Sequence, residues 1–485
     1  MAITKHEALK AIDREKAYLC SVSDKIWDNP ETAFEEFASC DALCDALERE
    51  GFTVEKNGAG IKTAFTGTWG SGKPIFGFLG EFDALSGLSQ QANTAVKSPI
   101  VDGACGHGCG HNLLGVGSVA AALATKEYLE QNNLSGTVIF FGTPGEEGGS
   151  GKAFMAREGV FDNLDFALTW HPGDNNGVSM NSSTANYQVI YRFYGISAHA
   201  GGSPWNGRSA LDALELMNTG VQYLREHVTT DTRIHYAITN TGGYSPNVVQ
   251  AYAEVIYLIR AKDTQSVQKV YERVNKIAQG AAMMTETRVE IDFVKGCSNL
   301  IPNRVMADLM QKNLTEVAKP VITEADHAMA KAIIESIPAA SKMDPSNRFS
   351  HVKDRALKAE LTEKHKDDDI LELVFPMFES EAPMGGSTDV SDVSWNCPTQ
   401  QCTTTTMAAG TPGHSWQLVA QGKSNLAHEG MLYAGRVMAA TAIDMIEDPA
   451  LVEAAKADFA ARMDGKKYIC PIPKGVQPRV LSAKK

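Results

Sequence analysis

The chain has 485 residues, of which 43% are hydrophobic and 21% are charged, and its formal net charge is -13. This length exceeds what one hydrophobic core organises, so we expect two domains, one of them interrupted by the other. The acidic balance excludes general nucleic-acid binding and disfavours an anionic membrane surface, because both partners require a basic face.

Helical and strand-like patterns alternate over the first 185 residues. Amphipathic helices are predicted over residues 4–29 and 35–50, and Asn29-Pro30 separates them because proline cannot continue a helix. The following segments, in chain order, are strands at 61–68 and 74–80, a helix at 113–129, a strand at 138–142, a helix at 152–157 and a strand at 166–170. This alternation predicts an α/β domain with a mostly parallel sheet and helices on both faces.

The pattern changes near Ala185. The next segments are a strand at 187–194, a helix at 208–228, strands at 233–240 and 251–262, a helix at 264–283 and a strand at 287–294. This β-α-β-β-α-β order is the ferredoxin-like motif. We therefore predict an inserted lid or dimerisation domain over residues 186–299, between two parts of the catalytic domain at 1–185 and 300–485.

The last part of the chain is less regular. Its predicted elements are helices at 303–314, 325–335, 355–364 and 429–446 and a strand at 403–408. Polar, loosely patterned sequence over about 315–378 specifies no arrangement. The tail from Lys466 is basic and contains proline, and we expect it on the surface.

Cysteine usage and the start of the chain bear on the compartment. Nine cysteines without regular spacing are typical of a reduced protein rather than a disulfide scaffold. Residues 1–16 are polar and lack the apolar core of a secretory signal. No apolar run reaches the roughly 18 residues that a membrane-spanning helix needs. We expect a cytoplasmic protein.

The segment 106–112 concentrates side chains that bind metal ions. It places Cys109 and His111 two residues apart among glycines, which let the backbone bend close to an ion. Glu146-Glu147 and His171 follow the next two predicted strands. Ligands gather at the carboxyl ends of parallel strands, so the spacing predicts a catalytic metal site. The alternative is a glycine-rich turn with a structural cysteine and a surface histidine.

Adjacent carboxylates suit two different tasks. Neighbouring side chains diverge in a loop, so one of Glu146 and Glu147 can bind metal while the other acts as general base. The alternative is a solvated helix start, where acidic residues are common. A thiolate can bridge two ions about 3.5–4 Å apart, which together activate water and polarise a carbonyl.

Several short motifs together resemble one family. They are residues 28–31, 80–85, 109–115, 142–149, 170–172, 197–200, 385–389 and 411–417. In this combination the chain resembles the aminoacylase/carboxypeptidase superfamily of dinuclear metallopeptidases. It is most similar to the amidohydrolase subgroup in which cysteine replaces the bridging aspartate.

The resemblance implies a role for each matching residue. Cys109 would bridge two divalent ions, manganese or zinc. The remaining metal ligands would be His111, Glu147, His171 and His414. Glu146 would be the general base and acid, and Asp83 would orient a ligand histidine. His428 is the competing choice for the last ligand; we prefer His414 because it follows a strand and a glycine turn.

The resemblance also assigns residues of the inserted domain. His199 would stabilise the oxyanion in the active site of a neighbouring subunit, so a homodimer is expected, with a homologous partner subunit as a further possibility. Asn247 and Arg260 would hold the substrate carboxylate. The implied activity is hydrolysis of the amide between an acyl or aroyl group and an amino acid. Candidate substrates are p-aminobenzoyl-glutamate, indole-acetyl-aspartate and dipeptides with a basic second residue.

Two hypotheses of other classes compete with this one. A literal Gly-x-Gly-x-x-Ala at residues 115–120 would suit a nucleotide-dependent oxidoreductase, but it lies inside a predicted helix rather than between strand and helix. A non-catalytic metal-binding partner subunit is the other possibility. The presence of Glu146 beside a full ligand set argues against it.

Overall fold

The structure is a computed structural model that describes residues 2–380 and 383–480. The chain divides into two compact units, each built from three segments. The first unit contains Met1–Asn181, Ile301–Ala382 and Val393–Tyr468. The second contains Ser182–Leu300, Pro383–Asp392 and Ile469–Lys485.

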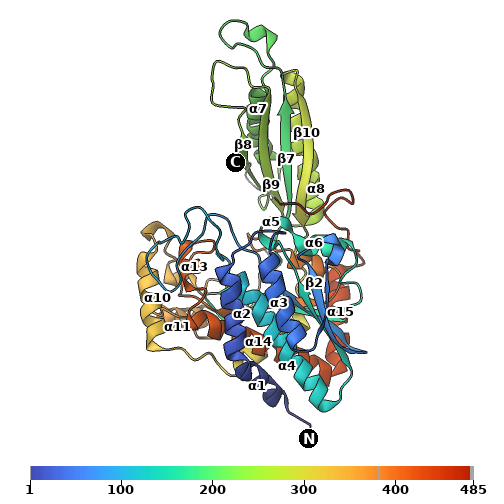
Figure 1. Ribbon diagram of the computed structural model, residues 1–485, viewed down its shortest axis with the longest axis vertical. Helices are drawn as coiled ribbons and strands as arrows, with labels where there is room; N and C mark the ends of the chain where they lie inside the picture. Colours follow the sequence, from blue (N-terminus) through green and yellow to red (C-terminus); the bar gives the residue numbers. More distant parts are fainter. Residues whose placement is uncertain (1, 381–382, 481–485) are drawn as a thin grey trace. The chain divides into compact units, whose positions relative to one another are not determined.

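A mixed sheet forms the centre of the first unit (Figure 1). Its strands are β1 (Thr53–Lys56), β2 (Phe65–Ser71), β3 (Ile75–Gly80), β4 (Gly136–Gly142), β5 (Phe166–Gly173), β6 (Gly177–Val178) and β11 (Thr399–Thr405). Their order across the sheet is β1-β2-β4-β3-β5-β11-β6. The central strands β4, β3, β5 and β11 run parallel, and the outer strands pair antiparallel. The predicted α/β domain is confirmed.

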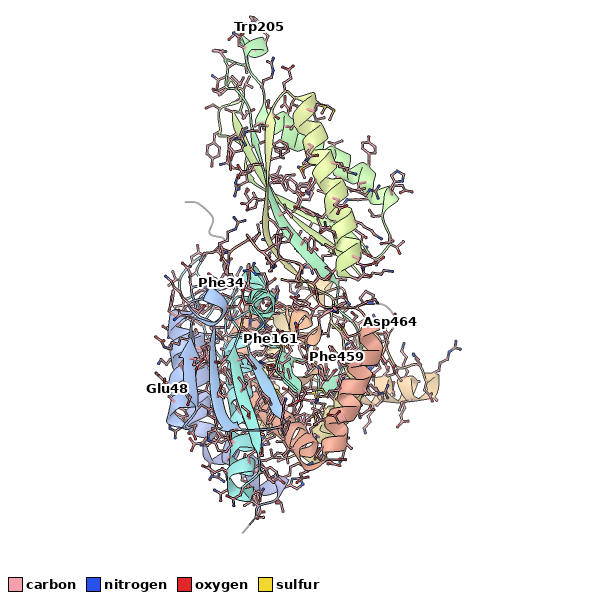
Figure 2. All side chains as sticks on the ribbon, turned by 90° about the vertical axis from the view of Figure 1, so that its right-hand side faces the viewer. Phe34, Glu48, Phe161, Trp205, Phe459 and Asp464 are labelled. Atoms are coloured by element: carbon pink, nitrogen blue, oxygen red, sulfur yellow. The ribbon has the colours of Figure 1, made fainter. Side chains whose placement is uncertain are left out.

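The helices of this unit precede, separate and follow its strands along the chain. They are α1 (Lys5–Arg14), α2 (Lys16–Asp28), α3 (Phe37–Arg49), α4 (His111–Asn132), α5 (Glu146–Gly149), α6 (Gly151–Arg157), α9 (Arg304–Glu316), α10 (Glu324–Ser336), α11 (Arg355–His365), α13 (Trp416–Gln421), α14 (Asn425–Glu447) and α15 (Pro449–Met463). Figure 2 shows Glu48 of α3 and Phe459 of α15 on opposite sides of the sheet. A further short helix, α12 (Val390–Ser394), spans the residues where the chain passes between the two units.

The predicted helix over residues 4–29 is two helices. Thr4 begins α1 with a capping box, in which its side chain accepts a hydrogen bond from the amide of Glu7 and the Glu7 carboxylate contacts the amide of Thr4. The chain leaves helical geometry at Glu15, with φ -93° and ψ 4°, and α2 then begins. A periodic apolar pattern persists across such a break, so the pattern alone does not reveal it.

Helices α4 and α14 pack against each other and against strands of the sheet, and most residues of both helices are buried. Small residues bring their backbones together: a Cβ on Gly435 would lie 2.8 Å from that of Ala120. Likewise, a Cβ on Gly117 would lie 2.7 Å from the indole nitrogen of Trp170. The literal Gly-x-Gly-x-x-Ala thus lies inside α4 and serves close packing.

The second unit is a four-stranded antiparallel sheet with two helices. Its elements are β7 (Ala185–Tyr194), α7 (Ala210–Leu224), β8 (Arg233–Asn240), β9 (Tyr252–Ala261), α8 (Thr264–Met284) and β10 (Arg288–Cys297). The strand order β10-β7-β9-β8 is that of a ferredoxin-like domain, as predicted. Trp205, labelled in Figure 2, lies in the loop between β7 and α7.

The second unit includes two segments that we expected, from the sequence, in the catalytic domain. In residues 383–392, Ser387 Oγ accepts a hydrogen bond of 2.7 Å from Arg260. In the C-terminal segment, Arg479 forms an ion pair of 2.9 Å with Asp292, and Ile472 is buried. The tail therefore does not simply lie on the surface, because an apolar side chain and an arginine anchor it.

The loosely patterned region has its own small core. Phe349 and Phe375 stack with ring centroids 4.9 Å apart, beside Leu371 and Ala409. The pattern is hard to read because short helices and turns supply these side chains singly.

Among the described residues, no helix has the length and apolar character needed to cross a membrane.

Candidate metal centre

The predicted ligands of the first unit lie at or near the ends of helices and strands. Gly110, with φ 81°, turns the chain between Cys109 and α4, of which His111 is the first residue. Glu147 lies in α5, directly after β4, and His171 lies in β5. His414 follows β11 in a turn where its own φ is 53°. Glu147 and His414 thus follow parallel strands of the sheet, and His171 lies near the end of another.

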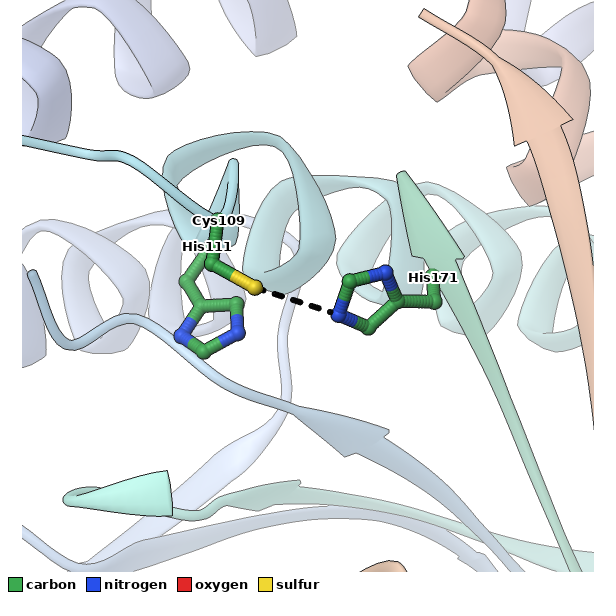
Figure 3. Close-up of side chains that lie close together, drawn as sticks. All are labelled: Cys109, His111 and His171. Carbon is green, nitrogen blue, oxygen red and sulfur yellow. Dashed lines mark hydrogen bonds between the residues drawn. The ribbon is translucent and has the colours of Figure 1, made fainter. Parts of the chain in front are cut away.

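The predicted ligand atoms form two groups that share the thiol. Potential ligand atoms of Cys109, His111 and His171 lie within 4.8 Å of one another, and so do those of Cys109, Glu147 and His414. Cys109 Sγ is 3.4 Å from His171 Nε2 (Figure 3). His414 Nε2 is 3.2 Å from Glu147 Oε1.

These distances fit bound metal ions. Two ligands that each lie about 2.0–2.3 Å from one ion are about 3–3.5 Å from each other when they occupy neighbouring positions. The sulfur, imidazole and carboxylate donors suit zinc and divalent ions of similar softness. The residues therefore fit a pair of divalent ions that share Cys109.

Electrostatics around the thiol depend on burial and on its neighbours. Burial raises the pKa of Cys109 to about 12, although His111 acts in the opposite direction. Burial also raises the pKa of Glu147, but hydrogen bonding to His414 and the charge of His111 outweigh it and lower that pKa to about 2. A metal ion would have to displace the thiol proton, whereas the carboxylate is already ionised.

Asp83 links two of the predicted ligands. Its Oδ1 is 2.9 Å from His111 Nδ1, and its Oδ2 accepts a hydrogen bond of 2.9 Å from the amide of Glu147. Burial lowers the pKa of His111, but its interactions with Cys109 and the hydrogen bond to the Asp83 carboxylate outweigh this and raise the pKa well above its usual value. This is the position in which a carboxylate orients a ligand histidine.

Glu146 and Glu147 begin the short helix α5 rather than lying in a loop. They are not fully exposed, however, because both are partly buried. The glycines around them permit this tight start: Gly145, with φ 69°, precedes the pair. Glu146 lies in a third group of potential ligands, with Glu81 and His111.

His428, the alternative last ligand, and His107, two residues before Cys109, both have other partners. His428 Nε2 is 3.0 Å from Asp24 Oδ1 and belongs to none of the three groups among the described residues. His107 is buried, and its Nε2 lies 3.1 Å from the carbonyl oxygen of Ile26. The geometry therefore favours His414 over His428 beside the other ligands.

The remaining predicted residues belong to the second unit. His199 forms an isolated antiparallel bridge with Val248, and Asn247 lies in the turn just before it, where its carbonyl accepts a hydrogen bond of 2.9 Å from the amide of Ala200. Arg260 lies on β9 and contacts Ser387. The structure thus brings His199 close to Asn247 along the backbone and gives Arg260 a separate partner.

The sequence analysis missed two residues beside the metal groups. Glu81 Oε2 is 3.1 Å from His111 Nε2, and Lys152 Nζ is 2.7 Å from Glu81 Oε1. Both side chains are buried. Glu81 stands in a recognised motif, but only Asp83 was assigned there. Lys152 carries no signal, because one polar residue in a short helix is usually exposed.

Comparison with known proteins identifies the family. The sequence profile of peptidase family M20/M25/M40 matches residues 77–364, which is more than half of the chain. The chain belongs to this family. The predicted metallopeptidase family and hydrolase class are confirmed, and the oxidoreductase hypothesis is set aside.

Two curated relatives and one solved structure illustrate the M20 likeness. The chain is 47% identical to one of the subunits of p-aminobenzoyl-glutamate hydrolase of Escherichia coli K12, over 97% of this chain and 98% of that one. It is 31% identical to Xaa-Arg dipeptidase of Mus musculus over 67% of this chain and 74% of the relative. A dinuclear metal-binding M20 peptidase of Bacillus subtilis has the same fold, with TM-score 0.52 and 17% identity over 89% of this chain and 99% of that one.

Proposed function

We propose that this M20 hydrolase cleaves the amide bond of p-aminobenzoyl-glutamate and releases p-aminobenzoate and glutamate. One observation carries the proposal: the 47% identity to a subunit that is named for this reaction extends over nearly the whole of both chains. The metal centre is compatible with this reaction. Its two ligand groups share Cys109 and could hold two ions, to which the carbonyl of an amide substrate would bind.

The proposed roles divide the chemistry among a few side chains. A bound pair of manganese or zinc ions would polarise the carbonyl and acidify water. Glu146 takes the proton of the attacking water and delivers it to the nitrogen of the leaving amine. Asp83 holds His111 by Nδ1, which leaves Nε2 as the ligand atom.

His199 is prepared to donate a hydrogen bond. Its Nδ1 accepts hydrogen bonds from the amides of Gly201 and Gly202, at 3.1 Å and 3.0 Å. Neutral His199 therefore carries its proton on Nε2. This tautomer supports the proposal that His199 donates to the carbonyl oxygen as negative charge develops there. Asn247 and Arg260 are proposed to bind the carboxylate of the substrate.

We also propose that the enzyme is a cytoplasmic homodimer, in which His199 serves the active site of the other subunit. Strand β8 lies at the edge of its sheet and exposes Tyr236 and Ile238, which are 41% and 43% accessible. An edge strand with exposed apolar side chains is a natural place for another chain to pair. A homologous partner subunit could occupy the same edge, since the relative from Escherichia coli is named as one subunit.

A dipeptidase is the second candidate, and the likeness to Xaa-Arg dipeptidase favours it. The two functions differ in the residue released, which is acidic in one case and basic in the other. Metal-loaded enzyme should be offered p-aminobenzoyl-glutamate, indole-acetyl-aspartate and an Xaa-Arg dipeptide, and kcat/KM should be compared. The proposal predicts the highest value for p-aminobenzoyl-glutamate. A higher value for the dipeptide would replace it with the second candidate.

A further inference from the structure

The imidazole of His111 is fully buried between two carboxylates. Asp83 Oδ1 lies 2.9 Å from Nδ1, and Glu81 Oε2 lies 3.1 Å from Nε2. The first contact is a hydrogen bond, whereas Nε2 has no hydrogen-bond partner in the described part of the chain. Glu81 thus lies beside the ring nitrogen without being aligned to accept from it.

Such an arrangement suits two atoms that face a common cation. When Asp83 accepts the Nδ1 proton, neutral His111 has a lone pair at Nε2. Two donors 3.1 Å apart, each about 2.1 Å from one ion, subtend about 95° at that ion, close to the angle between neighbouring octahedral ligands. The two predicted ligand pairs have similar spacings of 3.4 Å and 3.2 Å.

We propose that Glu81 is a further metal ligand, which binds the same ion as His111. Glu81, His111 and Glu146 have potential ligand atoms within 4.8 Å of one another, which makes them the third such group among the described residues. The inference rests on the proposed function, because it requires a loaded metal centre. It adds a carboxylate to the donors of the ion held by Cys109, His111 and His171.

Lys152 determines which oxygen of Glu81 is available. Its Nζ contacts Oε1 at 2.7 Å, and the two side chains are 0% and 2% exposed. Lys152 lies on α6, which follows α5 and its two glutamates, so this ion pair also ties α6 to the end of β3. Oε1 is thereby occupied, and Oε2 remains directed toward His111.

The competing explanation is that Glu81 serves only as the counter-ion of buried Lys152. Removing one member of a buried ion pair strands the other charge and is strongly destabilising, so single variants alone do not separate the explanations. The double variant Glu81→Gln/Lys152→Met does separate them, because it removes both charges together. The single variant Lys152→Met is the comparison for this double variant. It keeps the Glu81 carboxylate, whose charge a bound metal ion would neutralise in place of the lysine.

The experiment titrates metal-free protein with manganese and with zinc and counts the ions bound per chain. We expect two ions for the natural protein and for Lys152→Met. For the double variant we expect the loss of one manganese ion, or its binding weakened at least tenfold. Zinc should weaken less, because an oxygen donor matters more to manganese than to zinc.

Asp165→Asn provides the matched control. Asp165 is also a buried carboxylate, 5% exposed, and it pairs with Lys73 and Lys456 at 3.1 Å and 2.8 Å. It belongs to none of the three ligand groups. We expect this variant to lose stability and to keep both ions, so that general loosening is separated from loss of a ligand.

The outcomes distinguish this inference from the proposed function. A natural protein that binds no ion overturns both. A natural protein and a double variant that bind two ions equally tightly overturn only the role of Glu81. If circular dichroism shows the double variant unfolded, a crystal structure of the manganese-loaded natural protein decides. Glu81 Oε2 at about 2.0–2.2 Å from an ion supports the proposal, and Oε2 bonded to Lys152 or water alone rejects it.

Discussion

At the scale of single residues, the two adjacent glutamates have different surroundings. Glu147 lies beside His414 and contacts Asp83 through its amide, whereas Glu146 is grouped with Glu81 and His111. This difference matches the proposed division between ligand and general base. Adjacent identical residues could not be told apart by sequence spacing alone.

Replacing Glu146 with glutamine tests that division. We expect kcat to fall about 10²–10⁴-fold, because glutamine cannot take a proton, while both metal ions remain bound. Steady-state kinetics and metal analysis of the same sample check this. Glu127→Gln, which removes only a surface ion pair with Arg14, serves as the control. Unchanged kcat in Glu146→Gln would exclude Glu146 as the general base.

Metal uptake should depend on pH through Cys109. The pKa of the buried thiol is raised to about 12, so it is protonated at neutral pH and must release its proton when a metal binds. Affinity should therefore rise with pH, by up to about tenfold per pH unit for each proton released. Calorimetric titration in two buffers with different ionisation enthalpies measures the released protons. Uptake that is independent of pH, with no proton release, would exclude the thiol as a ligand.

At the scale of elements, the glycines of α4 are packing devices. Alanine is normally the better helix former by about 1 kcal/mol, yet a Cβ on Gly117 would lie 2.7–2.8 Å from three atoms of the Trp170 ring. Gly280 in α8 has no atom within 4 Å of the same position. A methyl group would therefore clash at Gly117 and find open space at Gly280, although both glycines lie in helices.

The variants Gly117→Ala and Gly280→Ala test this difference when their free energies of unfolding are compared. Gly117→Ala should lower the free energy of unfolding by about 1–3 kcal/mol through overpacking. Gly280→Ala should raise it by up to about 1 kcal/mol. Differential scanning calorimetry of the two variants and the natural protein provides the test. Stabilisation by Gly117→Ala would show that α4 and β5 are less closely packed than described.

Much of the element order could be predicted from the sequence, because period and turn residues are local signals. Strand β8 has the predicted bounds, and the α-β order around Cys109 is as expected. The break at Glu15 and the membership of Arg479 in the second unit could not be predicted, since neither interrupts a local pattern. Glu81 and Lys152 were missed for a related reason: residues 71 positions apart in the sequence form an ion pair only in the folded chain.

At the scale of the whole molecule, the proposed dimer gives His199 its role. Ile238→Lys places a charge on the exposed edge strand β8 and should yield monomers with little activity. Val321→Lys changes a 67% exposed apolar residue of the first unit and should leave the assembly intact. Analytical ultracentrifugation distinguishes the two. A fully active Ile238→Lys monomer would contradict the dimer.

Mixing two inactive variants tests the exchange of His199 directly. Glu146→Gln keeps His199, and His199→Ala keeps Glu146, so a mixed dimer contains one complete site if His199 acts across the interface. Random exchange of subunits should restore about a quarter of the natural activity, since half of the dimers are mixed. If mixing restores nothing although subunits exchange, His199 does not act in the other subunit.

The most direct test of the central claim is the metal content of the purified chain, measured by mass spectrometry beside hydrolysis of p-aminobenzoyl-glutamate. We predict about two divalent ions per chain. Activity should disappear when a chelator removes them and return with manganese or zinc. Full hydrolysis by protein shown to be metal-free would contradict this mechanism. The mechanism assigns the activation of the amide and of water to the metal ions alone.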